Sequence, residues 1–445
     1  MDSRDALILL IDPTDSESGR GYRNAVRDLG FKALSVFTGL SPAADRQADP
    51  ADPMSLRVND VDDAVQTIRT AGYDVRAVVP TNGSSLHVGD EIAARLGLPG
   101  NEPSLGWARR NKAAMRARAT EMGVRVPEYQ LVSSLDDAAE AARAIGFPVI
   151  VKQTMGTGSL GVVVVSSEAD LTKLDRAWTD LFGAPVTEWL VERYVRGREY
   201  AVNFCSAGGV HRLIDIWEYR WPDDRDYDFP LWDIVQIDSN HPDYGPVERF
   251  CQTVLNAFGL REGPGHIEVK CETESDDVYL IELASRFSGG PAVPMWSRHS
   301  DLRPFHDAVE CYLGRRPNVI DGDHGFRAVL GSVVVRNNDA SGTLVAVHGL
   351  DELRALPGVA DVLVEFQPGD HVPITDHNMC IPVSASVHGP DRAAVLRTIA
   401  AARAAVKLEI FPDSVDATSP VFTPGPIAER DEQTSARTQP SEHTS

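Results

Sequence analysis

The sequence predicts an α/β protein of two or three domains, and three observations support this. The 445 residues exceed what one hydrophobic core usually serves, and 42% of them are apolar. Residues 1–106 alternate between apolar strand-like runs and amphipathic helix-like runs, which indicates a small parallel α/β domain. From about residue 188 the pattern changes to strands with hairpin signals, which predicts an antiparallel sheet.

The N-terminal alternation begins with the strand-like run "ALILLID" and the helix-like run "YRNAVRDLGF". The strands "KALSVFT" and "VRAVVPTN" and the helices "VDDAVQTIRTAGY" and "VGDEIAARLGL" continue it. Residues 15–21 form an expected loop after the first strand, at the sheet edge where such domains bind ligands. A plain connecting loop is the simpler interpretation of this segment.

Composition and charge exclude several classes of partner. With 43 Lys and Arg against 65 Asp and Glu, the net charge is −22, so nucleic acid and anionic lipid are repelled. The five cysteines include no C-x-x-C pair, which argues against a zinc site and a disulfide framework. No apolar run reaches membrane-spanning length, and the N-terminus does not resemble a signal peptide. We therefore expect a reduced, cytoplasmic protein.

Residues 149–165 read "VIVKQTMGTGSLGVVVV" and contain the pattern G-x-G-x-x-G. A dinucleotide-binding turn needs a helix after the third glycine, whereas "VVVVSS" is strand-like. A protein kinase needs H-R-D and D-F-G, which the chain lacks, and here Lys152 precedes the glycines. The segment therefore predicts a β-hairpin with Lys152 on its first strand and a glycine tip that can approach phosphate oxygens. A purely structural glycine-rich hairpin is the alternative.

The order of the surrounding motifs carries a resemblance. Lys112 in "RRNKAAMRARATEMGV" precedes the hairpin, and "EWLVERYVRGREYAVN" and "GPGHIEVKCETESDDVYLIELASRFSGG" follow it. This order resembles the ATP-grasp superfamily over nearly the whole chain. The segments "GPGHIEVK" and "IELASRFSGG" look most like the L-amino-acid ligases of the bacilysin and dapdiamide synthetase type, which are carboxylate–amine ligases.

The resemblance implies an ATP-grasp fold with an N-terminal parallel α/β domain, a mobile lid and a C-terminal antiparallel-sheet domain. We expect an N-terminal domain at 1–106 and an ATP-grasp region at 107–325, with a lid at about 128–197. Residues 326–411 complete the catalytic domain. Residues 412–445 are rich in Pro, Ser, Thr, Gln and Glu, which predicts a disordered tail.

The resemblance also implies a set of nucleotide-binding residues. Lys112 and Lys152 would reach the phosphates of ATP, while residues 190–195 would meet the adenine base with Glu192 alongside it. Glu199 would accept the ribose hydroxyls. Alone, Lys112 reads as a solvated helix lysine, whereas Lys152 on an apolar strand is harder to explain without an anion. The implied set is Lys112, Lys152, Gly156, Gly158, Ser159, Gly161, Glu192, Tyr194, Val195 and Glu199.

A pair of carboxylates predicts a metal site. "HIEVKCE", the turn "TESDD" and "VYLIELASR" read as a hairpin, and a turn centred on Ser275 places Glu268 opposite Glu282. Two such carboxylates repel one another unless a cation lies between them, and Mg²⁺, or Mn²⁺ in its place, meets that need. Many relatives carry Asn where this chain has Ala284, which leaves the number of magnesium ions open. Surface acids on an edge hairpin are the alternative.

The substrate side is marked mainly by Arg286, which the resemblance places against an acyl phosphate and the oxyanion of amine attack. Arg286 and Lys152 are the expected catalytic residues. Gly289 and Gly290 in the following loop, and His266, are the other expected substrate contacts, although a structural histidine explains His266 equally well. Aromatic residues in "IWEYRWPDDRDYDFPLWD", Tyr219 among them, and in "VPMWSRHS" predict either a side-chain pocket or core packing.

The expected reaction is ATP-dependent joining of a carboxylate and an amine through an acyl phosphate, with release of ADP and phosphate. Two amino acids, or an amino acid and a small acid, are the expected small-molecule substrates. A biotin-carboxylase-like enzyme and a non-catalytic ATP-binding sensor remain as alternatives. The oligomeric state stays open, a homodimer included.

Overall fold

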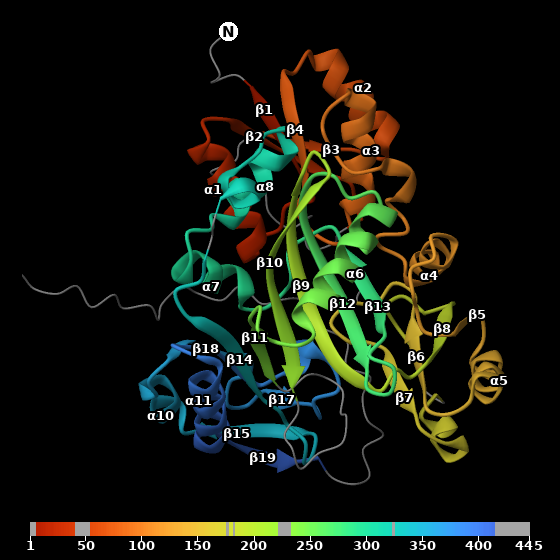
Figure 1. Ribbon diagram of the computed structural model, residues 1–445, viewed down its shortest axis with the longest axis vertical. Helices are drawn as coiled ribbons and strands as arrows, with labels where there is room; N and C mark the ends of the chain where they lie inside the picture. Colours follow the sequence, from red (N-terminus) through yellow and green to blue (C-terminus); the bar gives the residue numbers. More distant parts are fainter. Residues whose placement is uncertain are drawn as a thin grey trace, which may run out of the picture.

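The computed structural model describes residues 6–40, 54–174, 178–180, 183–220, 233–322 and 325–413. These residues form four β-sheets with helices packed on them, which confirms the predicted α/β class (Figure 1). Of the tail expected at 412–445, Pro412 is the last residue of strand β19 (Lys407–Pro412), and residues 414–445 lie outside the described residues. Residues 221–232, which make up most of the Trp-rich segment, lie outside them as well. Among the described residues, no helix is long and apolar enough to cross a bilayer.

The N-terminal sheet is parallel throughout and has apolar strands with helices on its faces. In spatial order its strands are β3 (Ser55–Arg57), β2 (Lys32–Phe37), β1 (Leu7–Ile11) and β4 (Val75–Pro80). Its helices are α1 (Glu17–Asp28), α2 (Val61–Ala71) and α3 (Leu86–Leu96). This agrees with the alternation in the sequence.

The expected loop at residues 15–21 is mostly helix. Helix α1 begins at Glu17, because the Ser16 side chain caps it by accepting the N–H of Gly19 at 3.3 Å. A Cβ atom added to Gly21 would lie 2.3 Å from the ring of Phe305, so this glycine packs tightly against helix α8 (Pro304–Tyr312). The segment is therefore a helix start packed into the protein and not an open ligand loop.

The lid has an antiparallel sheet in the order β5 (Tyr129–Val132), β8 (Trp189–Arg193), β6 (Val149–Gln153) and β7 (Val162–Val165). Helix α5 (Leu135–Ile145) and the 3-10 segment η4 (Glu168–Leu174) accompany it. The predicted β-hairpin is confirmed, with Lys152 paired to Val162. Every second valine of the hairpin lies in the lid core, which explains the β-branched run.

The large sheet has eight strands, and all its neighbouring strands are antiparallel. In order they are β13 (Val278–Ala284), β12 (Gly263–Glu272), β9 (Gly197–Ala207), β10 (Val210–Arg220), β11 (Asp233–Ile237), β14 (Val329–Val335), β18 (Val383–Gly389) and β16 (Val359–Val364). The expected division at 325/326 falls between β11 and β14, which are hydrogen-bonded neighbours. The sheet thus continues through that division, and in Figure 1 the lid lies beside its β13 edge.

Helices and a small sheet complete the structure, some of them in segments that the sequence left unassigned. The helices are α4 (Lys112–Glu121), α6 (Tyr244–Ala257), α7 (Ala292–His299), α8 (Pro304–Tyr312), α9 (Asn318–Asp321), α10 (Leu350–Ala355) and α11 (Arg392–Ala405). The small sheet joins β17 (His371–Val372), β15 (Gly342–His348) and β19 (Lys407–Pro412). Short 3-10 turns lie at η3 (Pro103–Leu105) and η5 (Asn378–Cys380).

Candidate functional site

One cavity collects most of the residues that the sequence singled out. It has a volume of about 1110 Å³, counted out to its mouth, and lies between the lid hairpin and the β12–β13 edge of the large sheet. The predicted residues that line it are Lys112, Lys152, Gly156, Gly158, Ser159, Glu192, Tyr194, Val195, Glu199, His266, Glu268, Glu282 and Arg286. Gly161, Gly289 and Gly290 do not line it. Tyr219, one of the aromatics that the sequence offered for a side-chain pocket, also lines it, whereas Lys270 and Asn378 line it and were not predicted.

Residues 154–161 connect β6 to β7 and form what we call the flap. Gly158, Ser159 and Gly161 adopt φ values of 60°, 63° and 67°, in the left-handed region that glycine enters without a steric penalty. Gln153 braces the flap, because its Nε2 donates to the Leu160 carbonyl at 2.9 Å. A Cβ atom on Gly161 would lie 2.8 Å from that same Nε2. Gly161 is thus needed for the turn although it does not line the cavity.

Lys152 and Glu192 form a buried charged cluster with Arg116 of helix α4. The Glu192 carboxylate contacts Lys152 Nζ and Arg116 Nε, and Arg116 Nη2 lies 3.3 Å from its second oxygen. Arg116 also donates to the Ile281 carbonyl at 2.8 Å. The exposed fractions are 5% for Lys152, 2% for Glu192 and 0% for Arg116. Glu192 is therefore committed to two cations, where the sequence suggested a place beside the adenine base.

The pKa shifts in this cluster follow from burial opposed by ion pairing. Burial raises the pKa of Glu192, but the charges of Arg116 and Lys152 outweigh it, so the pKa lies below its usual value. Burial lowers the pKa of Lys152, and Glu192 opposes part of that effect. Arg116 was missed in the sequence, although it follows Lys112 by four residues and so shares its helix face.

Glu268 and Glu282 lie directly opposite one another on β12 and β13, as the hairpin pattern predicted. Lys112 Nζ lies 3.0 Å from Glu282 Oε2 and donates to the Gly156 carbonyl at 2.8 Å, so it connects the flap to this carboxylate. Burial raises the pKa of Glu282, but Lys112, and then Arg286 and Lys152, lower it to about 2. Both carboxylates face the cavity, and one of them already lies beside a cation. Such a pair is a set of oxygen donors that suits Mg²⁺.

His266 is oriented from behind by a chain of hydrogen bonds. Its Nε2 lies 3.5 Å from Glu268 Oε1, and that oxygen accepts a hydrogen bond from the Tyr219 hydroxyl at 3.2 Å. Its Nδ1 lies 3.0 Å from Asn203 Oδ1, and Asn203 Nδ2 donates to Asp215 Oδ1 at 2.8 Å. Because the Asn203 amide nitrogen donates to Asp215, the Asn203 amide oxygen faces His266 and accepts a hydrogen bond from Nδ1–H. Nε2 is thus left facing the cavity.

Two tryptophans that suggested a side-chain pocket belong to the core. The indole N–H groups of Trp217 and Trp296 each donate to Asp215 Oδ2 at 2.6 Å. Both rings are almost completely buried, in the cluster that joins the N-terminal sheet to the large sheet. Core packing is therefore the correct one of the two interpretations for these residues.

Lys270 organises the part of the cavity next to residues 190–195. Its Nζ lies 3.4 Å from Glu199 Oε2, donates to the Val195 carbonyl at 3.3 Å and lies 4.6 Å from the centre of the Tyr194 ring. The main-chain N–H of Tyr194 donates to the Pro148 carbonyl at 3.1 Å. Lys270 follows Glu268 by two residues on β12, so strand alternation could have placed it on the same face.

Arg286 lies at the opposite side, where the N-terminal domain meets the cavity. It donates to the Phe287 carbonyl at 2.7 Å, and a Cβ atom on Gly83 would lie 3.6 Å from its Nε. Gly83 follows strand β4, so the N-terminal domain contributes a wall beside this guanidinium. Gly289 and Gly290 follow in the turn that leads to helix α7.

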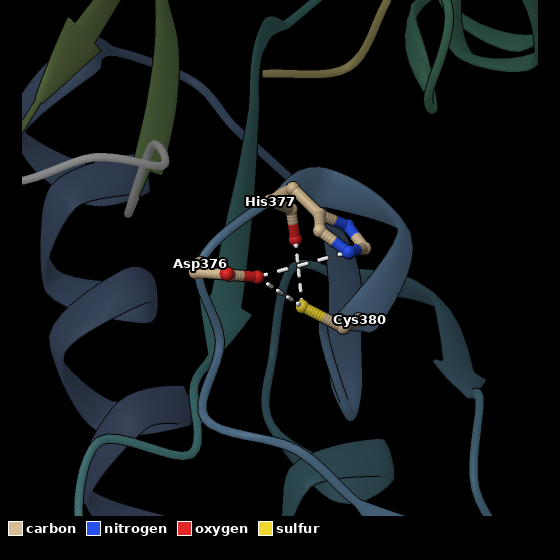
Figure 2. A group of neighbouring side chains, drawn as sticks. All are labelled: Asp376, His377 and Cys380. Atoms are coloured by element: carbon tan, nitrogen blue, oxygen red, sulfur yellow. Dashed lines mark hydrogen bonds and ion pairs between the residues drawn. The ribbon is translucent and has the colours of Figure 1, made fainter. Parts of the chain in front are cut away.

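Asp376, His377 and Cys380 are a second group of potential metal ligands, with their donor atoms within 4.8 Å of one another (Figure 2). His377 Nδ1, however, accepts the main-chain N–H of Met379 at 3.2 Å. The neutral ring then carries its proton on Nε2, which leaves no ring lone pair for a metal. We therefore interpret these side chains as the cap of turn η5.

Two family models match the chain. An ATP-grasp domain covers residues 145–294, and L-amino acid ligase C-terminal domain 2 covers residues 338–410. The expected resemblance is confirmed in both parts: the chain carries an ATP-grasp domain followed by an L-amino acid ligase C-terminal domain.

Named relatives and solved structures agree with these domains. The L-arginine-specific L-amino acid ligase of Bacillus subtilis is 25% identical over 310 residues, 66% of this chain and 70% of the relative. Dapdiamide A synthase of Enterobacter agglomerans is 24% identical over 376 residues, 82% of this chain and 87% of the relative. The L-amino acid ligase from Bacillus licheniformis superposes with a TM-score of 0.70 at 16% identity, covering 92% of this chain and 99% of that one.

Proposed function

From an ATP-grasp domain followed by an L-amino acid ligase C-terminal domain, we propose that this chain is an ATP-dependent ligase that joins an amino acid to a second amino acid or a small acid. The observation that carries the proposal is the convergence of cations and carboxylates in one flap-covered cavity. Lys112, Lys152 and Arg286 supply the positive charge. Glu268 and Glu282 supply the carboxylates.

The triphosphate of ATP would lie beneath the flap. A chain with a net charge of −22 must gather cations locally to hold a polyphosphate, and Lys112 and Lys152 both face the cavity. Gly156, Gly158 and Ser159 bring main-chain N–H groups close to the same space. We assign Glu192 the task of holding Lys152, since both its oxygens are already engaged.

The nucleoside would occupy the end of the cavity formed by Tyr194, Val195 and Glu199. The Glu199 carboxylate is an acceptor suited to ribose hydroxyls. Lys270 holds that carboxylate in place, because its ammonium lies 3.4 Å away. Glu268 and Glu282 would hold Mg²⁺, which supplies neutralisation of phosphate charge when bound.

In the proposed reaction a substrate carboxylate oxygen attacks the γ-phosphorus of ATP, the bond to the β-phosphate oxygen breaks, and ADP leaves. The amine of the second substrate then attacks the acyl phosphate carbonyl. A carbon–nitrogen bond forms, the carbon–oxygen bond to phosphate breaks, and the amine proton passes to solvent or phosphate. Arg286 would stabilise both the acyl phosphate and the oxyanion, as a guanidinium suits two adjacent oxygens.

The substrates would lie between Arg286 and His266. His266 Nε2 and the Glu268 carboxylate are both acceptors, so they suit the ammonium or amine group of an amino acid. The loop with Gly289 and Gly290 directly follows Arg286, and we assign it to the same side. The ligase relatives named above support amino acids as the substrate class.

The test is a phosphate-release assay with purified protein, ATP, Mg²⁺ and the common amino acids, supplied singly and in pairs, with product masses measured in parallel. We expect phosphate release to depend on particular substrates and to match the amide formed. Bicarbonate-dependent release stimulated by biotin would replace the proposal with a carboxylase. Tight ATP binding without release under any substrate pair would replace it with a sensor.

A further inference from the structure

We propose that Asn378, in the turn of residues 376–380, is a positioning residue that holds the flap closed over the cavity. We call residues 376–380 the C-terminal turn. Through this contact the C-terminal part of the chain would control whether water reaches the activated substrate. The inference rests on the proposed ligase function for its chemical consequence, but the contact itself can be tested without it.

The contact is made between main chains. The N–H of Asn378 donates to the carbonyl of Gly158, at the tip of the flap, at 2.9 Å. A Cβ atom on Gly158 would lie 3.7 Å from the Asn378 Cβ, so the two segments are in van der Waals contact. Asn378 also lines the cavity. The C-terminal turn therefore forms part of the cavity wall and fastens the flap at one place.

The Asn378 side chain points to a ligand as well. Its Oδ1 is buried and has no hydrogen-bond partner, although the residue borders the cavity. Burial of an amide oxygen without a hydrogen-bond partner costs free energy. Such an oxygen in a native protein therefore usually indicates that a bound group supplies the missing donor. Rotation of the carboxamide exchanges its oxygen and nitrogen, so the group can also donate an N–H to a phosphate oxygen. ATP beneath the flap would provide that acceptor.

The C-terminal turn is held firmly enough to act as a fixed anchor. Cys380 Sγ donates to the His377 carbonyl at 3.1 Å (Figure 2). The His377 ring accepts the Met379 N–H. Thr375 links the turn to the large sheet, because its Oγ1 accepts the N–H of Asn337, just after β14, at 2.9 Å. These contacts hold the main chain on both sides of Asn378.

The chemical consequence concerns water. If the flap opens while the acyl phosphate is present, water can attack its carbonyl carbon in place of the amine. The carbon–oxygen bond to phosphate then breaks, and the free carboxylate and phosphate are released with ATP spent and no amide formed. Loss of the Asn378 contact should therefore raise the amount of phosphate released per amide formed.

Asn378→Pro removes the N–H with little local strain. His377 before it is extended, with φ −155° and ψ 167°, which a following proline tolerates. Asn378 is the first residue of η5, the position that proline favours in helical turns. Asn378→Ala keeps the N–H and removes only the carboxamide. Met379→Ala is the matched control, because it changes the neighbouring side chain and leaves both groups of Asn378 intact.

We expect Asn378→Pro to raise the phosphate-to-amide ratio at least threefold and to speed hydrogen exchange in flap residues 154–161. Asn378→Ala should raise the KM for ATP at least threefold with a smaller change in the ratio, and Met379→Ala should behave as the parent chain. An unchanged ratio and unchanged flap exchange in Asn378→Pro would overturn the proposal. If that variant does not fold, an unchanged KM for ATP in Asn378→Ala, which lacks the carboxamide that faces the cavity, would overturn it instead. If the parent chain forms no amide, the exchange measurement still decides the contact, and only the proposed function fails.

Discussion

The substitution Glu192→Gln should destabilise the β-sheet of the lid. Glu192 is buried between Lys152 and Arg116, and the substitution removes the only negative charge of this cluster while keeping the side-chain shape. Two buried cations then face a neutral amide. Breaking a buried ion pair by removing one partner costs about 3–5 kcal/mol, since the remaining charge loses its compensation.

Hydrogen exchange is the appropriate assay, because a multi-domain chain does not unfold in one step and local opening can be read peptide by peptide. In Glu192→Gln, a loss of about 3–5 kcal/mol corresponds to exchange roughly 100- to 4,000-fold faster in β6 and β8. MgATP should reduce this difference, because phosphate oxygens would then compensate Lys152.

Glu168→Gln is the matched control in the same lid. Glu168 pairs with Arg143 at 2.7 Å, but the two side chains are 63% and 49% exposed. Exposed pairs of this kind are screened by solvent and contribute little, so exchange should change less than about fivefold. Equal exchange in the two variants would refute the buried-charge reasoning.

Three further results are expected. Glu282→Gln should lower the rate of amide formation about 100-fold or more in the phosphate-release assay, with an unchanged circular dichroism spectrum, because a shared ligand of metal and phosphate is lost; activity within threefold of the parent would contradict the metal assignment. Gly161→Ala should cost about 1–2 kcal/mol of flap order and raise the KM for ATP roughly tenfold, since its φ is 67° and Gln153 Nε2 lies 2.8 Å from the added Cβ. Gly209→Ala, equally strained at φ 79° but in a distant hairpin, should leave that KM unchanged. Burial raises the pKa of Glu282, but Lys112 and then Arg286 lower it to about 2. The ionised Glu282 therefore stabilises the folded state above pH 4.5, and this stabilisation is lost as the pH falls towards 2. Hydrogen exchange in β13 at pH 6 and pH 3, corrected for the intrinsic exchange rates, should therefore show a larger acid loss of protection in the parent chain than in Glu282→Gln.

Local patterns in the sequence were sufficient for the elements that carry them. Alternating valines predict the β6–β7 hairpin, and the short turn after Glu272 sets the register that brings Glu268 opposite Glu282. Both depend on residues close together in the chain. The same holds for the ATP-grasp resemblance, which rests on the order of such segments.

Other features depend on contacts between distant segments, which no local pattern records. Glu192 meets Arg116 across 76 residues, so helix periodicity gives the face of Arg116 but not its partner. Asn378 meets the flap only because the C-terminal turn folds back onto the lid. Trp217 and Trp296 could equally have lined a pocket, and only the buried Asp215 between them decides for the core.

The continuity of the large sheet sets a limit on how this protein can be divided. Strand β14 supplies the hydrogen-bonding neighbour of β11, and helix α11 clamps the same region through Arg403 with Asp233 and Arg392 with Glu218. A fragment cut at residue 325 would present a bare strand edge and two orphaned acids, and such edges invite association with other chains. The part with the nucleotide site and the C-terminal part should therefore be produced as one polypeptide. An exchange of C-terminal parts between relatives would also have to transfer the β11–β14 pairing and the two ion pairs of helix α11.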